Sequence, residues 1–226
     1  MFPVVYDNEP AKVIAPGSYF TDADGFFPGL RLTVNAVPGG WTSFENDSGE
    51  LHLVGDPDRG TLLLWKDMVA VVTNHRGEDG GQPLAGVGSD REAIVTWLTT
   101  LSDVEILDGP EDITVGHGIT GTQLTLRTSD TANFGWDDCP ENPRCVELLT
   151  DPLHWRSNVT VKYQPFTILG EQTLRIFVAT IPFDDGPDHT LYVTLVVPKA
   201  SDLDAFTEAA QPIIDSLTAP DVYVAN

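Results

Sequence analysis

The sequence predicts an α+β fold, an antiparallel β-sheet with two main helices packed on it. Short segments alternate apolar and polar residues between compact turns, as antiparallel strands do. Two longer segments, residues 89–101 and 201–217, repeat apolar residues at helical spacing. The order strands, helix, strands, helix favours helices packed on an antiparallel sheet over a parallel sheet.

The N-terminal half predicts a run of strands. Residues 30–34 (LRLTV) and 51–54 (LHLV) alternate apolar and polar side chains, and 61–65 (TLLLW) and 68–73 follow. The turns, such as residues 56–60 (DPDRG), are too short for the crossover that parallel strands need. We therefore expect an antiparallel meander.

The first helix is predicted over residues 89–101. Ser89 is the expected N-cap, and Glu92, three residues later, would complete a capping box. Four apolar residues then fall on one stripe: Ile94, Trp97, Leu98 and Leu101.

Further strands are expected in the second half. Gly116 and Gly118 mark a hairpin turn with His117 between them. Residues 173–181 are expected to pair with 190–197 across an Asp-rich turn. The other expected strands are residues 104–106, 113–115, 122–126, 145–149 and 160–169.

The final helix is predicted over residues 201–217. Ser201 is the expected cap, and Asp202 and Asp204 would face the positive end of the helix dipole. Pro212 lies inside the pattern and should kink or interrupt the helix. The apolar face comprises Leu203, Phe206, Ala210, Ile213, Ile214 and Leu217.

The proline-rich first part, residues 1–29, is interpreted as an extended lead-in that lies over the fold. Residues 30–226 are interpreted as one α+β domain, which 226 residues in all can supply with a sizeable core. Residues 30–110 and 111–226 form an alternative division into two similar halves, although no sequence repeat supports duplication.

The net charge argues against a nucleic-acid partner, and the hydropathy argues against a transmembrane helix. Twelve Lys and Arg stand against 34 Asp and Glu, which gives a net charge of −22. Nucleic-acid binding depends on Lys and Arg neutralising phosphates, so no nucleic-acid partner is expected. No stretch approaches the roughly 18 apolar residues of a transmembrane helix.

The two cysteines, Cys139 and Cys145, lie on either side of a turn stiffened by Pro140 and Pro143. This turn can bring them within disulfide distance, and no further ligands are spaced for zinc. A disulfide indicates an oxidising, extracytoplasmic location. No leader sequence follows Met1, so we expect the mature part of a secreted protein or of a lipid-anchored one.

A resemblance covers most of the chain. Residues 17–21 (GSYFT), 27–34 (FPGLRLTV) and 39–41 (GGW), with the later glycine hairpin and cysteine pair, resemble uncharacterised secreted proteins of soil bacteria, of actinobacterial type. The ending IDSL at 214–217 is similar to the PsbP/Mog1/LpqN-like lipoproteins. The resemblance implies an extracytoplasmic sandwich used as an accessory or binding module. It carries over no active-site residue.

A hydrolase is the alternative function. No Gly-x-Ser-x-Gly motif occurs, and the histidines at 52, 75, 117, 154 and 189 are scattered. His189 follows three aspartates, and His154 lies near Asp137 and Asp138 in sequence. A catalytic site, metal-assisted or not, would therefore use His154 with Asp137 or Asp138 and would be assembled from loops.

No cofactor is predicted, and calcium is the metal ion for which the sequence offers candidate ligands. Asp22, Asp24, Asp56 and Asp58 place oxygen ligands on tight turns, as calcium requires. Asx turns explain the same aspartates without an ion.

The preferred function is that of a non-catalytic accessory or ligand-binding protein. Phe134, Trp136, Trp155 and Tyr163 cluster in sequence among acidic residues, which suits a cationic or sugar-like ligand. The alternative is that these rings fill the core under the cysteine loop. A small molecule or a protein is the expected partner.

Overall fold

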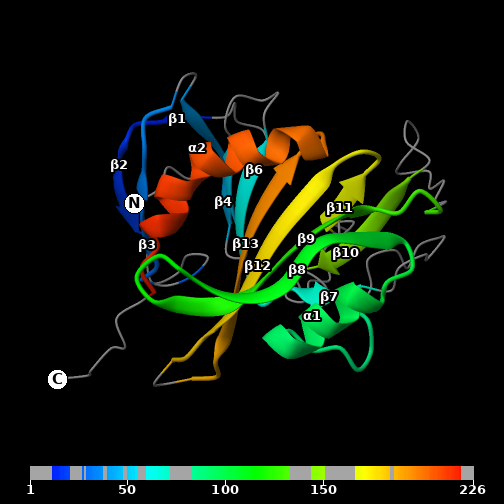
Figure 1. Cartoon of the computed structure of the whole chain (residues 1–226). Coiled ribbons are helices and arrows are strands. Elements are labelled where there is room, and N and C mark those ends of the chain that lie inside the picture. The colour runs from blue at the N-terminus through cyan, green and yellow to red at the C-terminus, as the bar shows by residue number, and fades with distance from the viewer. Residues whose placement is uncertain are drawn as a thin grey trace, which may run out of the picture.

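The computed structural model describes most of the predicted elements (Figure 1). The described residues are 12–20, 27, 29–37, 40–47, 50–54, 60–71, 83–132, 144–150, 166–183 and 186–219.

A central sheet organises the described chain. Its strands follow the order β1-β4-β5-β6-β13-β12-β9-β8, and every neighbouring pair is antiparallel. The N-terminal meander β4-β5-β6 joins the C-terminal strands where β6 pairs with β13. The bounds are β1 Lys12–Ile14, β4 Trp41–Asp47, β5 Glu50–Val54, β6 Thr61–Lys66, β8 Val104–Val115, β9 Ile119–Thr128, β12 Thr173–Ile181 and β13 His189–Val197.

Smaller elements cover this sheet. A two-stranded ribbon consists of β2 (Gly17–Phe20) and β3 (Arg31–Val34). A three-stranded sheet follows the order β11-β10-β7. Its strands are β11 Phe166–Leu169, β10 Cys145–Thr150 and β7 Val69–Ala70, and the helices are α1 Arg91–Thr100, the 3-10 turn η2 Ala200–Asp202 and α2 Leu203–Asp215.

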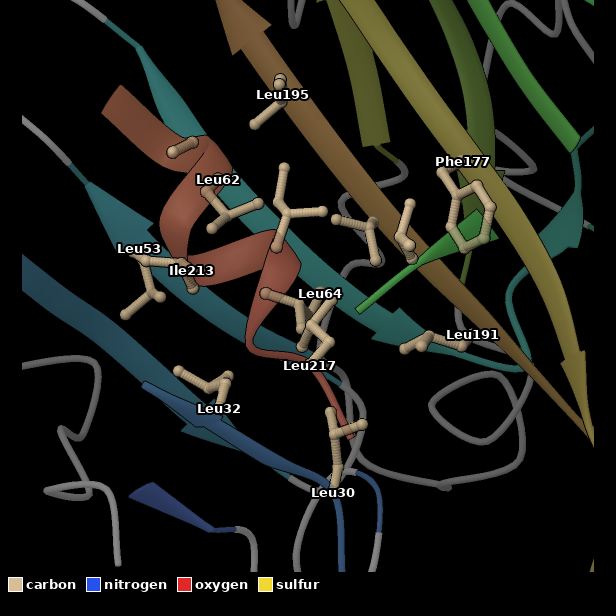
Figure 2. Packing of buried hydrophobic residues seen from close by; sticks show 14 of the residues in the cluster. Leu30, Leu32, Leu53, Leu62, Leu64, Phe177, Leu191, Leu195, Ile213 and Leu217 are labelled. Atoms are coloured by element: carbon tan, nitrogen blue, oxygen red, sulfur yellow. The ribbon is translucent and has the colours of Figure 1, made fainter. Parts of the chain in front are cut away.

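One face of the central sheet packs against α2 and β3. Alternate residues of β6 and β13, such as Leu62 and Leu64 or Leu191 and Leu195, point into this core. Figure 2 shows them beside Ile213 and Leu217, from α2 and the residues that follow it. The core therefore holds the end of α2 close to the ribbon.

The opposite face packs against α1 and the three-stranded sheet. Leu63 and Trp65 of β6 and Tyr192 of β13 belong to this second core, with Ile94 and Leu98 of α1. Because the central strands are covered on both faces, runs such as LLLW are continuously apolar rather than alternating.

The predicted fold class is confirmed as α+β, with an antiparallel sheet and two helices packed on it. The predicted pairing of residues 173–181 with 190–197 is also found, as β12 with β13. Residues 12–14 and 17–20 of the predicted lead-in form strands.

Both predicted helix caps were wrong. The N-cap of α1 is Asp90, whose extended backbone lets its Oδ1 accept from the Ala93 amide at 2.9 Å. Ser201 lies inside η2 and donates to Asp202, so it does not cap α2. The 3-10 turn occupies the position where a cap would act.

The structure corrects further expectations. The predicted interruption at Pro212 is wrong, because α2 continues through it and the residues after it, Ile213 and Ile214, are held in the core. The kink at Pro212 stays a prediction. Residues 104–106 and 113–115 belong to one strand, β8, which is bent by two register shifts. Residues 30–34 and 68–73 leave the predicted meander, since β3 pairs with β2 and β7 pairs with β10. The strand β4, which was not predicted, takes a place in the meander beside β5.

Candidate functional site

The site residues predicted from sequence fall almost entirely outside the described residues. Cys145 is described, and it is buried at the start of β10. Phe166, which neighbours the predicted aromatic cluster in sequence, packs edge-on against Trp65 at 4.6 Å between ring centroids. The residues outside the described part are Phe134, Trp136, Trp155, Tyr163, His154, Asp137, Asp138, Cys139, Asp22, Asp24, Asp56 and Asp58.

The described residues form a different cavity, of about 290 Å³, which we call the ribbon pocket. It is lined by the β2–β3 ribbon, by His117 at the tip of the β8–β9 hairpin, and by Ser216 and Thr218 after α2. Three segments far apart in sequence thus meet at one place.

The ribbon supplies hydroxyl groups, aromatic rings and an arginine to this pocket. Phe20 pairs with Arg31 in the strand register, and Ser18 pairs with Thr33. The Ser18 and Thr33 hydroxyls lie 3.1 Å apart in a hydrogen bond. Tyr19 is half-buried, and its hydroxyl donates to the Ala15 carbonyl at 2.6 Å. Ser18, Phe20, Arg31 and Thr33 therefore occupy the outward face of the ribbon.

Backbone and hydroxyl bonds fix the ribbon to the end of α2. The Thr218 amide donates to the Arg31 carbonyl at 2.9 Å, and the Arg31 amide donates to the Thr218 carbonyl at 3.1 Å. Ser216 Oγ accepts from the Thr33 amide at 2.7 Å and donates to the Ile213 carbonyl at 2.7 Å. Three of these bonds join the ribbon to the residues after α2, and the fourth holds Ser216 to the last turn of α2.

The hairpin is held against the same segment. The His117 amide donates to the Leu217 carbonyl at 2.8 Å. Gly116 has a φ of +53°, and a Cβ at this position would collide with the Leu217 carbonyl oxygen. Glycine therefore permits the close approach that places the exposed His117 at the pocket.

The ribbon pocket differs in charge from the protein as a whole. Arg31 and His117 line it, and none of the described lining residues is acidic. The chain carries a net charge of −22, so a described lining without acidic side chains is a local exception. Such a lining provides hydrogen-bond donors for an anionic or hydroxylated ligand.

Two of the lining hydroxyls, those of Ser216 and Thr218, are not arranged as nucleophiles. A serine nucleophile must share its proton with a base. Ser216 Oγ instead donates its proton to the Ile213 carbonyl, and Thr218 Oγ1 donates to the Ser216 carbonyl at 3.3 Å. Both hydroxyls are therefore committed to the backbone.

A second cavity, of about 530 Å³, lies at the β10–β11 end of the small sheet. Arg144 lines it and forms an ion pair with Asp130 at 2.8 Å, and Gln172 Oε1 accepts from the Leu169 amide. Arg144 and Gln172 are thus each engaged with another part of the protein.

A histidine–aspartate pair lies elsewhere in the described structure. His189 Nδ1 is 2.5 Å from Asp67 Oδ2, and Asp67 Oδ1 accepts from the Thr190 amide at 2.8 Å. Phe183 packs edge-on against the imidazole. Sequence reasoning placed His189 beside the aspartates of its own turn, because the β6–β13 pairing was not foreseen.

No group of three or more metal-ligating side chains occurs among the described residues. In the same part of the chain, no helix is both long and apolar enough to cross a membrane. Comparisons with protein-family models, curated proteins and solved structures find no match to this chain.

Proposed function

We propose that the chain is a non-catalytic accessory or ligand-binding protein that holds a small molecule in the ribbon pocket. The observation that carries this proposal is that the ribbon, the hairpin tip with His117 and the residues after α2 meet around one cavity, whose described lining holds no acidic residue on a chain of charge −22. The aromatic surface around residues 134–163 remains a second predicted binding surface, for a ligand or a protein partner.

The proposed location is extracytoplasmic, secreted or lipid-anchored, and it rests on the predicted disulfide between Cys139 and Cys145. The proposed kinship is with the PsbP/Mog1/LpqN-like sandwiches, and the antiparallel sheet with two packed helices is compatible with it. The division into two similar halves also remains a prediction.

A ligand screen with a blocked variant tests the binding function. Small anions, sugars and sugar acids are added to the whole chain, and the unfolding midpoint is followed, because a ligand of the native state raises it. Ser18→Trp places a bulky ring on the outward face of the ribbon. Ser102→Trp, at an exposed site after α1, is the matched control. We expect a ligand whose effect survives in the control and disappears in Ser18→Trp. If no ligand behaves in this way, the pocket is not the binding site.

One observation favours the second candidate, a hydrolase with a loop-assembled His/Asp site. His189 has its Nδ1 held by Asp67, as a catalytic base often has its imidazole held by a carboxylate. Ester hydrolysis that is abolished by His189→Ala and kept by His117→Ala would establish this function. The binding proposal predicts no turnover by either protein.

A further inference from the structure

We infer that the ligand of the ribbon pocket is a neutral sugar, recognised as a single pyranose ring. This ligand class rests on the proposed binding function and deepens it. Three observations carry it: the exposed ring of Phe20, the neutral hydrogen-bonding groups beside that ring, and the size of the cavity.

The charges around the pocket favour a neutral ligand. No acidic residue occurs in the described lining, so a cation finds no counter-charge there. The chain as a whole carries a net charge of −22, which repels a free anion. Arg31 also lines the cavity, but it already has an interaction partner within the protein, so no ligand contact is assigned to it. A neutral ligand meets neither of these two obstacles.

The apolar face of the sugar ring is recognised by Phe20. This side chain is 48% exposed, although it is a large apolar group at a cavity whose lining is mostly polar. One face of a pyranose carries mainly C–H groups, and such a face packs well against an aromatic ring. The hydroxyls at the edge of the sugar are then left to reach polar groups of the pocket.

Hydroxyl groups of the ribbon lie within reach of that edge. Ser18 lies two residues before Phe20 on β2, so both side chains leave the same face of the ribbon, about 7 Å apart along the strand. Thr33 is the cross-strand partner of Ser18, and their hydroxyls share a hydrogen bond of 3.1 Å. This bond uses one of the two protons, so the pair can donate the other proton to a ligand and can also accept.

The rest of the lining adds one donor and one acceptor. The His117 imidazole is exposed at the hairpin tip and offers a ring N–H. Thr218 Oγ1 donates to the Ser216 carbonyl at 3.3 Å, which leaves its lone pairs to accept. A sugar hydroxyl both donates and accepts, so it can use groups of both kinds, whereas an inorganic anion uses mainly donors.

The cavity limits the ligand to one ring. Its volume of about 290 Å³ lies close to the lower end of the range typical of small-molecule sites, roughly 300–1,000 Å³.

Calorimetric titration of the whole chain with D-glucose, D-galactose, D-mannose and inorganic phosphate tests the inference. We expect at least one of these sugars to bind roughly tenfold more tightly than phosphate, with an affinity that does not change with salt because the ligand is neutral. Phe20→Ala should weaken this sugar about tenfold, and Phe20→Trp should retain it because an aromatic face is restored. Leu107→Ala is the matched control, since Leu107 is an apolar side chain of similar exposure, 40%, on β8.

Other results would overturn the inference. Tighter binding of phosphate than of every sugar, or an affinity that falls as salt rises, would make the pocket an anion site. Equal affinities in Phe20→Ala and Leu107→Ala would remove the role of the aromatic ring. If none of the three sugars binds while another molecule shows the loss in Ser18→Trp, the neutral sugar is wrong and the binding function stands. If no molecule shows that loss, both fail.

Discussion

His189 Nδ1 lies 2.5 Å from Asp67 Oδ2. This contact joins the first residue of β13 to the turn after β6. Asp67 has a φ of +52°, in the left-handed region that aspartate tolerates better than most residues. Its amide also donates to the Thr190 carbonyl at 2.9 Å. Asp67 thus fixes the end of the strand pair that unites the two halves of the central sheet.

Replacing this carboxylate should destabilise the fold. Asp67→Asn keeps the size of the side chain and tolerates the left-handed backbone, but it removes the charge that faces His189. Both side chains are less than one-third exposed. We expect a loss of about 1.5 kcal/mol, the scale of a hydrogen bond to a charged group. Urea unfolding at neutral pH measures it. Asp188→Asn, at an exposed site beside His189, is the control and should change stability little.

Tyr192 makes stability depend on alkaline pH. Burial raises the pKa of its phenol well above 10.0, and the carboxylates of Asp67 and Asp90 raise it further. Its hydroxyl donates to the Met68 carbonyl at 2.7 Å. The unfolded chain loses this proton near pH 10, whereas the folded chain keeps it. Stability from this group is therefore intact below about pH 10 and falls above it, by about 1.4 kcal/mol per pH unit.

The comparison of the native chain with Tyr192→Phe isolates this effect. The variant loses the Met68 bond at every pH, so it should be less stable at pH 8. Its stability should then fall less steeply between pH 10 and 11. Parallel curves for the native chain and Tyr192→Phe would show that the buried phenol does not contribute.

Local sequence patterns predicted both helices and most strands, although not β1, β2 and β4. They predicted the β12–β13 pairing but few of the contacts between more distant segments. The alternation in residues 30–34 and the stripe from Ile94 to Leu98 are local, and both elements were found. The β6–β13 pairing and the ribbon pocket join residues more than a hundred positions apart. His117 was recognised at a hairpin tip, yet nothing local to it indicates that Leu217 and Arg31 lie beside it.

The N-cap of α1 shows that local sequence rules can favour the wrong one of two adjacent residues. Ser89 and Asp90 are both good N-cap residues, and the capping box with Glu92 favoured Ser89. Because Oδ1 of Asp90 bonds the Ala93 amide, Asp90→Ala should cost about 1 kcal/mol. Ser89→Ala should cost much less. Thermal unfolding of the two variants compares their stabilities directly. A larger loss of stability in Ser89→Ala than in Asp90→Ala would support the predicted capping box of Ser89 and Glu92 instead.

The cysteine pair can be tested independently of the fold. We predict a disulfide between Cys139 and Cys145, whose closed loop of seven residues stabilises the chain by about 2 kcal/mol. Mass spectrometry after alkylation without reductant should therefore find no modified thiol. Reductant should lower the unfolding midpoint of the native chain and leave a Cys139→Ser, Cys145→Ser double variant unaffected. Two alkylated thiols in the unreduced protein would refute the pairing.

Gly116 controls the hairpin wall of the ribbon pocket. Gly116→Ala puts a methyl group against the Leu217 carbonyl and strains a left-handed backbone. Gly118→Ala provides the matched control, because its φ is +91° but nothing lies within 4 Å of the added methyl group. Both variants should lose stability through backbone strain, by roughly 1–2 kcal/mol. Only Gly116→Ala must also push the hairpin away from α2. Hydrogen exchange at the His117 amide, which donates to Leu217, should therefore accelerate in Gly116→Ala alone. Equal acceleration in both variants would mean that the close approach to Leu217 does not position His117.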